Sequence, residues 1–286
     1  MTASIFSFAS GKGGVGKTLV TASVGIKLAR KGYRVLLIDG DMGLRNMELV
    51  FGLENECLYN ICDVADGKCF FEDAVLSVIP GLQFLPASPG ESWDDIFPSS
   101  IDTVLEDLNR RYDYILIDCP AGMGKGIEAA FRISERNFCV VVPSWASKRN
   151  SDNLVSMIPG RKAYSFILNQ FSASDDTKLS LEEMLETVDP EYLGGVLPYS
   201  REVDRLAHHG RLSDFNDYNA FGQSLDYLLR GILEGKEFPE SKWNSLLESG
   251  DRENEKDMQG NRKNAKKSGG LSWNSTSRVY RWHRRR

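Results

Sequence analysis

Long hydrophobic runs are missing from this 286-residue sequence. No window comes near the ~20 uninterrupted apolar residues that a membrane-spanning helix needs. The first residues, MTASIFSFAS, lack a basic segment followed by a long apolar stretch, which argues against a secretory signal. Hydrophobic residues make up 41% of the chain and charged residues 26%, as in ordinary globular proteins. We therefore expect a cytoplasmic protein.

Cysteine and histidine are also scarce. The five cysteines are an odd number and include no Cys-x-x-Cys pair, and only three histidines accompany them. The three cysteines closest along the chain have a spacing that matches no common zinc or iron–sulfur motif. We therefore interpret the cysteines as reduced thiols packed in a cytosolic core. They are Cys57, Cys62, Cys69, Cys119 and Cys139.

Acidic residues are absent from the end of the chain. Residues 258–286 contain nine Lys or Arg and no Asp or Glu, so the preceding residues carry a net charge of −14, against −5 for the whole chain. We place the end of the globular domain at residue 239 and treat residues 240–286 as a polar to basic tail. Trp243, Leu246 and Leu247 predict one or two amphipathic turns, and residues 249–270 are expected to be disordered.

Short apolar runs alternate with helical patterns throughout residues 1–239. Continuous apolar strands of this kind are typical of a parallel sheet covered by helices on both faces. We therefore predict an α/β fold, a P-loop NTPase domain with a single doubly wound, mostly parallel sheet. The predicted strands are residues 5–9, 33–39, 82–86, 114–118, 138–143, 164–169 and 195–198, and the predicted helices include residues 17–30, 101–111 and 181–188.

Residues 11–18 read GKGGVGKT and fit the phosphate-binding pattern G-x-x-x-x-G-K-[ST]. The pattern follows a predicted strand and opens a predicted helix, as the motif requires. Its glycines allow backbone N–H groups to point at phosphates, and the helix N-terminus adds partial positive charge. Lys17 is expected to reach the β- and γ-phosphates, and the Thr18 hydroxyl to bind Mg²⁺. The predicted nucleotide-binding residues are Gly11, Lys12, Gly13, Gly14, Val15, Gly16, Lys17 and Thr18.

Three carboxylates follow or end predicted strands. Asp118 ends an apolar strand, where an aspartate of this fold class holds Mg²⁺ through water. A strand-end aspartate such as Asp39 or Asp41 can simply cap a helix, but beside a P-loop both are expected near the γ-phosphate. Gly11 and Asn169 should lie at the same edge of the sheet, because the carboxyl ends of parallel strands form the ligand site. The predicted metal residues are Thr18, Asp39 and Asp118.

A lysine directly after the first glycine distinguishes this P-loop from ordinary ones. The segment Gly11-Lys12-Gly13-Gly14 resembles the deviant Walker A motif of the MinD/ParA family, which includes nitrogenase iron protein and the arsenite-pump ATPase. Residues 39–48, DGDMGLRNME, are similar to switch I of the MinD branch, and residues 118–122, DCPAG, resemble its switch II. The resemblance spans about residues 5–238.

The resemblance implies an ATP-dependent, dimerising switch ATPase that regulates the position of the division septum. ATP and Mg²⁺ would be its cofactors, and hydrolysis would be slow and stimulated by a partner. Lys12 would reach the other subunit's phosphates in an ATP-bound homodimer, Asp41 would position the hydrolytic water, and Asn169 would read adenine. Activator and division-inhibitor proteins would be its partners. Association with the inner face of the cell membrane would be peripheral and would depend on ATP.

Several residues depart from the family pattern. Around residues 148–150 the arginine–aspartate pair of the activator-binding helix is shifted or lost, and residues 242–248 lack the basic face of the family's membrane-inserting helix. Inside the motifs the departures are Leu19 for a second hydroxyl residue, Gln170 for a frequent arginine, and Cys119 for a small hydroxyl residue.

The end of the tail has its own pattern. Residues 278–286, RVYRWHRRR, interleave aromatic side chains with positive charge. Such a segment suits an anionic membrane, where Trp and Tyr sit at headgroup depth, and it also suits the phosphates of DNA. A solvated tail that binds neither is the third alternative. We favour the membrane, because the resembling family needs a C-terminal anchor.

Other functions stay open on the same fold. A ParA-like partition ATPase or a flagellar-number regulator would place the basic tail on DNA, although the L-R-N of switch I favours the MinD branch. An iron–sulfur carrier would use paired cysteines, and a colourless purified protein without iron would exclude it. A small-molecule kinase or synthetase is a further alternative.

Overall fold

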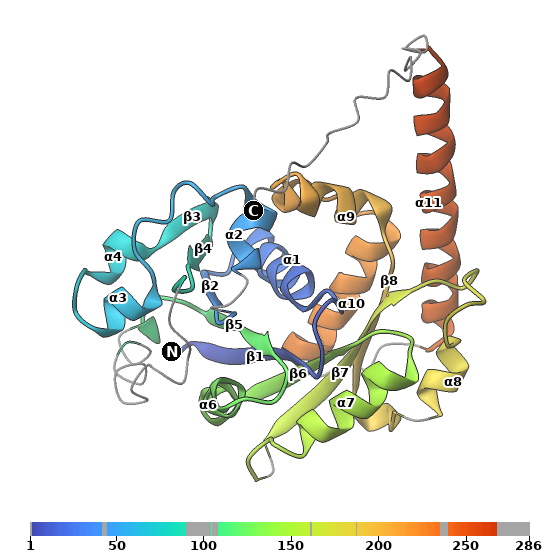
Figure 1. Ribbon diagram of the computed structural model, residues 1–286. Helices are drawn as coiled ribbons and strands as arrows, with labels where there is room; N and C mark the ends of the chain where they lie inside the picture. The colour runs from blue at the N-terminus through green and yellow to red at the C-terminus, as the bar shows by residue number, and fades with distance from the viewer. Residues whose placement is uncertain are drawn as a thin grey trace, which may run out of the picture.

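The computed structural model describes residues 2–41, 45–89, 104, 108–160, 162–186, 188–234 and 240–267. Its centre is a sheet of eight strands in the order β3-β4-β2-β5-β1-β6-β7-β8 (Figure 1). The strands are β1 (Ser4–Ser10), β2 (Val35–Asp39), β3 (Leu76–Ile79), β4 (Leu82–Leu85), β5 (Tyr114–Ala121), β6 (Arg136–Val141), β7 (Ala163–Phe171) and β8 (Leu193–Pro198).

Seven of these strands run parallel, and each coincides with a predicted apolar run. The prediction of a mostly parallel sheet is therefore confirmed. The strand that the sequence did not predict is β3, which forms an antiparallel hairpin with β4 at one edge of the sheet. It has only four residues and none of them is fully buried, so it lacks the continuous apolar run of its neighbours.

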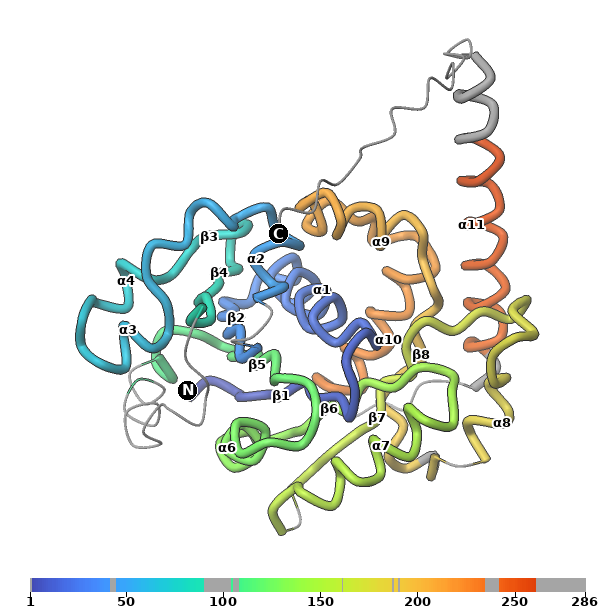
Figure 2. The backbone as a smooth tube through the Cα atoms, viewed as in Figure 1, coloured from blue at the N-terminus to red at the C-terminus, as the bar shows by residue number. Residues whose placement is uncertain are grey.

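Helices cover both faces of the sheet (Figure 2). Successive residues of β1 alternate between the two cores: Phe8 packs in one, and Ile5 and Ala9 in the other. The helices of the first face are α1 (Lys17–Arg30), α2 (Asn46–Phe51), α9 (Arg201–His208) and α10 (Ala220–Glu234), with the 3₁₀ turn η2 (Leu212–Asp214). Those that contribute to the second core are α3 (Ile61–Ala65), α4 (Phe71–Ala74), α6 (Lys125–Ile133), α7 (Trp145–Val155), α8 (Leu181–Leu185) and α11 (Glu240–Lys267), with η1 (Pro190–Tyr192) nearby.

The expected disorder of residues 249–270 is wrong for residues 249–267, because α11 runs as one helix through Lys267; residues 268–270 lie outside the described residues. Its side chains Trp243, Leu246 and Leu247 are buried, as the amphipathic pattern suggested. The next turns have few apolar residues but still bind the body of the protein, because polar side chains on the same helix face make hydrogen bonds to it. Composition alone indicated disorder because such polar docking leaves no apolar pattern.

Two other expectations concern helices and membranes. Most of the predicted helix 101–111 lies outside the described residues, and the predicted helix 181–188 is shorter, ending at Leu185. Among the residues that the structure describes, no helix has both the length and the apolar composition to cross a membrane.

Candidate nucleotide-binding site

The glycine-rich loop connects β1 to α1 and has the strained backbone that glycine permits. Gly14 and Gly16 both have φ of 80°, and Gly16 is the N-cap residue of α1. A Cβ on Gly11 would lie 2.6 Å from the backbone oxygen of Asn150 in α7, so a side chain does not fit there. The loop therefore places the first turn of α1, whose N–H groups have no partner within the helix, at the carboxyl ends of the parallel strands.

Lys17 and Thr18, at the start of α1, both contact Asp118 of β5. The Nζ of Lys17 lies 2.6 Å from Asp118 Oδ1, and the Thr18 hydroxyl donates to Oδ2 at 2.6 Å. Burial favours the neutral amine, but the charge and hydrogen bond of Asp118 outweigh it and raise the pKa of Lys17. The Thr21 hydroxyl also reaches Asp118, at 3.3 Å. A protonated lysine is therefore held beside a carboxylate at the point where phosphates enter a P-loop.

Asp39 ends β2 directly beside Asp118, its register partner in β5. The backbone N–H of Asp41 donates to Asp39 Oδ1 at 2.9 Å, while the other oxygen of Asp39 is buried without a partner. Burial, and then the neighbouring Asp118 carboxylate, raise the pKa of Asp39 to about 8. Two adjacent carboxylates, one with a free oxygen, and the Thr18 hydroxyl are the hard oxygen ligands that Mg²⁺ prefers. The predicted metal residues thus come together and fit this ion.

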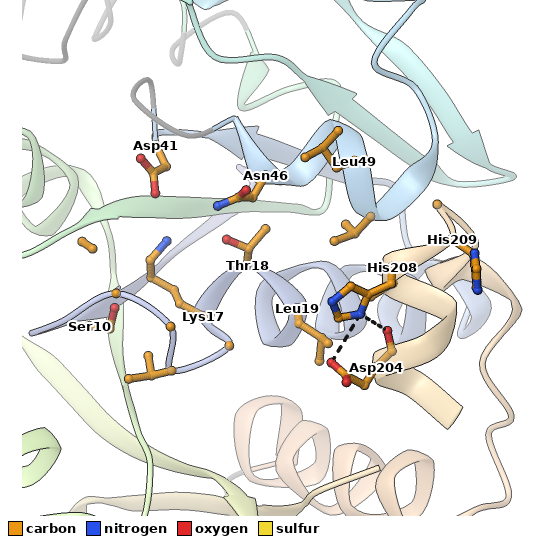
Figure 3. Close-up of a pocket in the computed structure, with 18 of the residues that line it drawn as sticks. Ser10, Lys17, Thr18, Leu19, Asp41, Asn46, Leu49, Asp204, His208 and His209 are labelled. Atoms are coloured by element: carbon orange, nitrogen blue, oxygen red, sulfur yellow. Dashed lines mark hydrogen bonds and ion pairs between the residues drawn. The ribbon is translucent and has the colours of Figure 1, made fainter. Parts of the chain in front are cut away.

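A cavity of about 640 Å³ begins at this cluster. This volume is within the usual range for small-molecule sites. Figure 3 shows Lys17, Thr18, Asp41 and Asn46 at its phosphate end, with Leu49 of α2 and His208 of α9 farther along. Asp41 is mostly buried, whereas the side chain of Lys12 is exposed.

Asn169, the predicted adenine reader, lies on the other side of the P-loop. Its amide donates to the Val15 carbonyl at 2.9 Å, and it is almost fully buried. It borders a smaller cavity of about 30 Å³. The residues that line this cavity are Gly16, Leu19, Asn169, Gln170, Pro198, Tyr199, Ser200, Val203, Asp204 and Phe221.

Strained backbone flanks the site on both sides. Among the described residues, the non-glycine residues with positive φ are Arg45, at 48° before α2, and Gln170, at 60° after Asn169. Such conformations cost of order 1–3 kcal/mol and gather at ligand sites and switch segments. Arg45 lies within the predicted switch I, and Gln170 borders the cavity beside Asn169.

Several residues at or near the site were not predicted from sequence. Thr21 was detectable, because it lies one helical turn after Lys17 and Thr18 and faces the same carboxylate. Asp204 and His208 had no local signal, since α9 reaches the cavity only through the tertiary fold.

The five cysteines, which all lie within the described residues, form no disulfide. Burial raises the pKa of Cys119 and of Cys139 to about 12, so both are neutral thiols at physiological pH. In the part of the chain that the structure describes, no group of three or more His, Cys, Asp or Glu side chains is placed to hold a metal ion.

A glycine loop between a strand and a helix, a buried lysine and two strand-end aspartates define a P-loop nucleotide-binding protein. Residues 6–213 match the model of the CobQ/CobB/MinD/ParA nucleotide binding domain. The septum site-determining protein MinD of Bacillus subtilis (strain 168) is 32% identical over 234 residues, which cover 78% of this chain and 87% of that protein. The MinD of Synechocystis sp. is 34% identical over 201 residues, covering 68% and 75%. This chain belongs to the MinD branch of the family.

Solved structures agree with this assignment. The MinC:MinD cell division protein complex of Aquifex aeolicus contains a chain with a TM-score of 0.71 and 30% identity, covering 83% of this chain and 98% of that one. The septum site-determining protein MinD of Pyrococcus horikoshii, complexed with Mg-ADP, has a TM-score of 0.71 and 27% identity, covering 81% and 96%. The family resemblance and the fold predicted from sequence are confirmed, and the chain is an ATPase of the MinD type.

Proposed function

We propose that this protein is an ATP-switched, dimerising ATPase that regulates septum placement. The observation that carries the proposal is the cluster of Lys17, Thr18 and Asp118, joined by contacts of 2.6 Å at the head of the P-loop. Membership of the MinD branch supports the cellular role, and the Mg-ADP complex of the Pyrococcus horikoshii relative supports ATP and Mg²⁺ as cofactors.

The buried contacts suggest how the site changes when ATP enters. The triphosphate competes with Asp118 for the ammonium group of Lys17, because both are anions. Thr18, Asp118 and the free oxygen of Asp39 would hold Mg²⁺, which would supply positive charge to neutralise the phosphates. Beside a cation Asp39 would be held as the carboxylate. Asp41, at the phosphate end of the cavity, orients the attacking water.

The dimer follows from the position of Lys12. Its side chain is exposed at the P-loop, whereas Lys17 is buried in the same loop. A second, exposed cation at the P-loop is suited to the phosphates of another subunit, as the resemblance implies. Hydrolysis is then slow in the monomer and increases when a partner stabilises the dimer, because the site is complete only there.

Partners and location complete the proposal. The solved MinC:MinD complex of the Aquifex aeolicus relative supports a protein partner that inhibits division, and a separate activator would accelerate hydrolysis. The basic residues 268–286 lie outside the described residues, and we assign them to an anionic membrane surface. Two tails in an ATP dimer would bind together and gain avidity. A second candidate, a ParA-like role with the tail on DNA, rests on the same positive charge.

Sedimentation with anionic liposomes tests the function. We expect the full chain to sediment with Mg-ATP but not with Mg-ADP, and less at high salt, because the contacts are electrostatic. A chain truncated after Gly270 should stay in the supernatant. If the full chain sediments equally with Mg-ATP and Mg-ADP, the proposed ATP switch is wrong. If the truncated protein still sediments, the membrane anchor lies in residues 240–270. Preferential binding to duplex DNA over liposomes would favour the second candidate.

A further inference from the structure

The helix α11 is hydrogen-bonded to the loop that follows β8. The Asn254 amide donates to the Tyr199 carbonyl at 2.9 Å, and its oxygen accepts from the Arg201 N–H at 2.8 Å. The Asn254 side chain thus bonds two backbone groups of the loop at the carboxyl end of β8. Figure 1 shows α11 standing beside β8 and α9, which this loop connects.

The same helix also holds the loop after β7. The carboxylate of Asp251 accepts hydrogen bonds from the Ser172 hydroxyl at 2.7 Å and the Ser174 N–H at 2.8 Å. A Cβ on Gly250 would lie 2.9 Å from Cβ of Pro198, so the helix backbone is pressed against the end of β8. We call residues 250–257 of α11 the strap, because they tie together two loops that are distant in sequence.

The strap binds two segments that adjoin the small cavity beside Asn169. Gln170, two residues before the bonded Ser172, and Tyr199, whose carbonyl accepts from Asn254, both line that cavity. Its volume of about 30 Å³ is far below the ~300–1,000 Å³ of small-molecule sites. A purine ring needs several times this volume, so the walls must separate before it enters. Because the strap bonds both loops, their separation strains or breaks those bonds.

We propose that the strap opposes binding of the nucleoside half of ATP, and that nucleotide binding in turn loosens α11. Asn254 is then a positioning residue for the base pocket, since it acts through Tyr199 and Arg201. The inference rests on the proposed placement of adenine at Asn169. The coupling is reciprocal. If the docked strap weakens nucleotide binding by a given free energy, bound nucleotide weakens docking of the strap by the same free energy.

The coupling links the nucleotide site to the end of the chain. The residues after Lys267 follow α11 in the chain, and the Arg205–Asp257 ion pair at 3.0 Å joins this part of α11 to α9. ATP therefore acts on α11 of each subunit as well as on dimerisation.

The test compares ligands with and without a base on the full-length protein. Asn254→Ala removes both hydrogen bonds to the β8–α9 loop. The matched control is Asn244→Ala, the same change at an exposed position of the same helix. The probes are Mg-ADP and Mg-tripolyphosphate, which has the phosphates but no nucleoside, each measured by calorimetry.

We expect Asn254→Ala to bind Mg-ADP about threefold to tenfold more tightly than Asn244→Ala, the effect of one or two hydrogen bonds, with no difference for Mg-tripolyphosphate. In wild-type protein, Mg-ADP should accelerate amide exchange across residues 246–257, and Mg-tripolyphosphate should not. The proposed coupling would be overturned if Asn254→Ala bound Mg-ADP no more tightly than its control. It would also be overturned if the affinities for both ligands rose equally.

A second pair of variants covers the case in which Asn254→Ala does not fold. Asp251→Ala releases the β7 loop, and Glu255→Ala, at an exposed position of the same helix, is its control. We expect Asp251→Ala to bind Mg-ADP more tightly than Glu255→Ala, with no difference between the two variants for Mg-tripolyphosphate. If wild-type protein binds tripolyphosphate but not ADP, the base placement is wrong, and if it binds neither, the proposed function itself fails.

Discussion

Lys12 and Lys17 are the same residue type in one loop, but their surroundings separate their roles. Lys17 is buried on Asp118, and Lys12 is exposed. We expect Lys17→Ala to weaken Mg-ATP binding by about 10- to 100-fold, because a charged hydrogen-bond partner of the phosphates is lost. Lys12→Ala should keep the affinity and lose ATP-dependent dimerisation and turnover. Equal losses of affinity in both variants would remove the cross-dimer role.

Asp41 lines the cavity beside Lys17 and Thr18, and its backbone N–H donates to Asp39 Oδ1. A carboxylate that orients water acts in the transition state and not in ground-state binding. Asp41→Ala should therefore lower kcat by about 100-fold or more while the affinity for ATP survives. The variant should elute as an ATP-bound dimer on gel filtration. Hydrolysis at the wild-type rate would show that another group positions the water.

Asp39 makes the nucleotide-free protein sensitive to pH. Its pKa is raised to about 8 in the folded chain, from 3.8, so the folded state keeps a proton that the unfolded chain has lost. Stability from this group is therefore greatest near pH 4 and declines as the pH rises toward 8, by up to ~1.4 kcal/mol per pH unit. Urea unfolding without nucleotide or Mg²⁺ should show Asp39→Asn gaining on wild type between pH 6 and pH 8. A constant difference would contradict the raised pKa.

Among the helices, α11 is stabilised mainly by its contacts with the rest of the protein. Leu247 is 3% exposed in the second core, although it belongs to a largely polar helix. Leu247→Ala should lower the free energy of unfolding by about 2–5 kcal/mol, as expected for a buried leucine. The exposed Ser245→Ala, on the same helix, should change it little. Equal stability of the two variants in urea would mean that α11 does not pack in solution.

The elements also differ in how far the sequence predicted them. The helix α1 was predicted with the bounds Lys17–Arg30 that the structure has, because the P-loop determines where it begins. The strand β3 was missed because it is short and only half-buried, so its sequence has no clear period. Order in residues 249–267 was missed for a different reason: hydrogen bonds to distant loops hold them, and such bonds have no signature in local composition.

For the whole molecule, the proposed dimer predicts how activity depends on concentration. If Lys12 completes the site of another subunit, turnover per molecule should rise with protein concentration until the dimer saturates. Lys12→Ala should be inactive at every concentration. ATPase assays over a ~100-fold range of protein concentration measure this dependence. Constant turnover per molecule in wild-type protein would place the complete site within one subunit.

The sequence by itself determined the phosphate-binding loop and the class of sheet. Both depend on local chemistry: glycines that permit positive φ, a lysine and threonine at a helix start, and continuous apolar strands. The motifs by themselves also indicated the MinD branch. The roles of Lys12, Asp41 and Asn169 stay predictions.

Only the tertiary structure decided which groups meet. It brings Asp118 to Lys17 across 101 residues of chain, directs the Asn169 amide to the Val15 carbonyl, and ties α11 to loops after β7 and β8. These are contacts between polar groups far apart in sequence. Periodicity reports which face of an element is apolar, but it does not report which polar partner a folded chain places opposite.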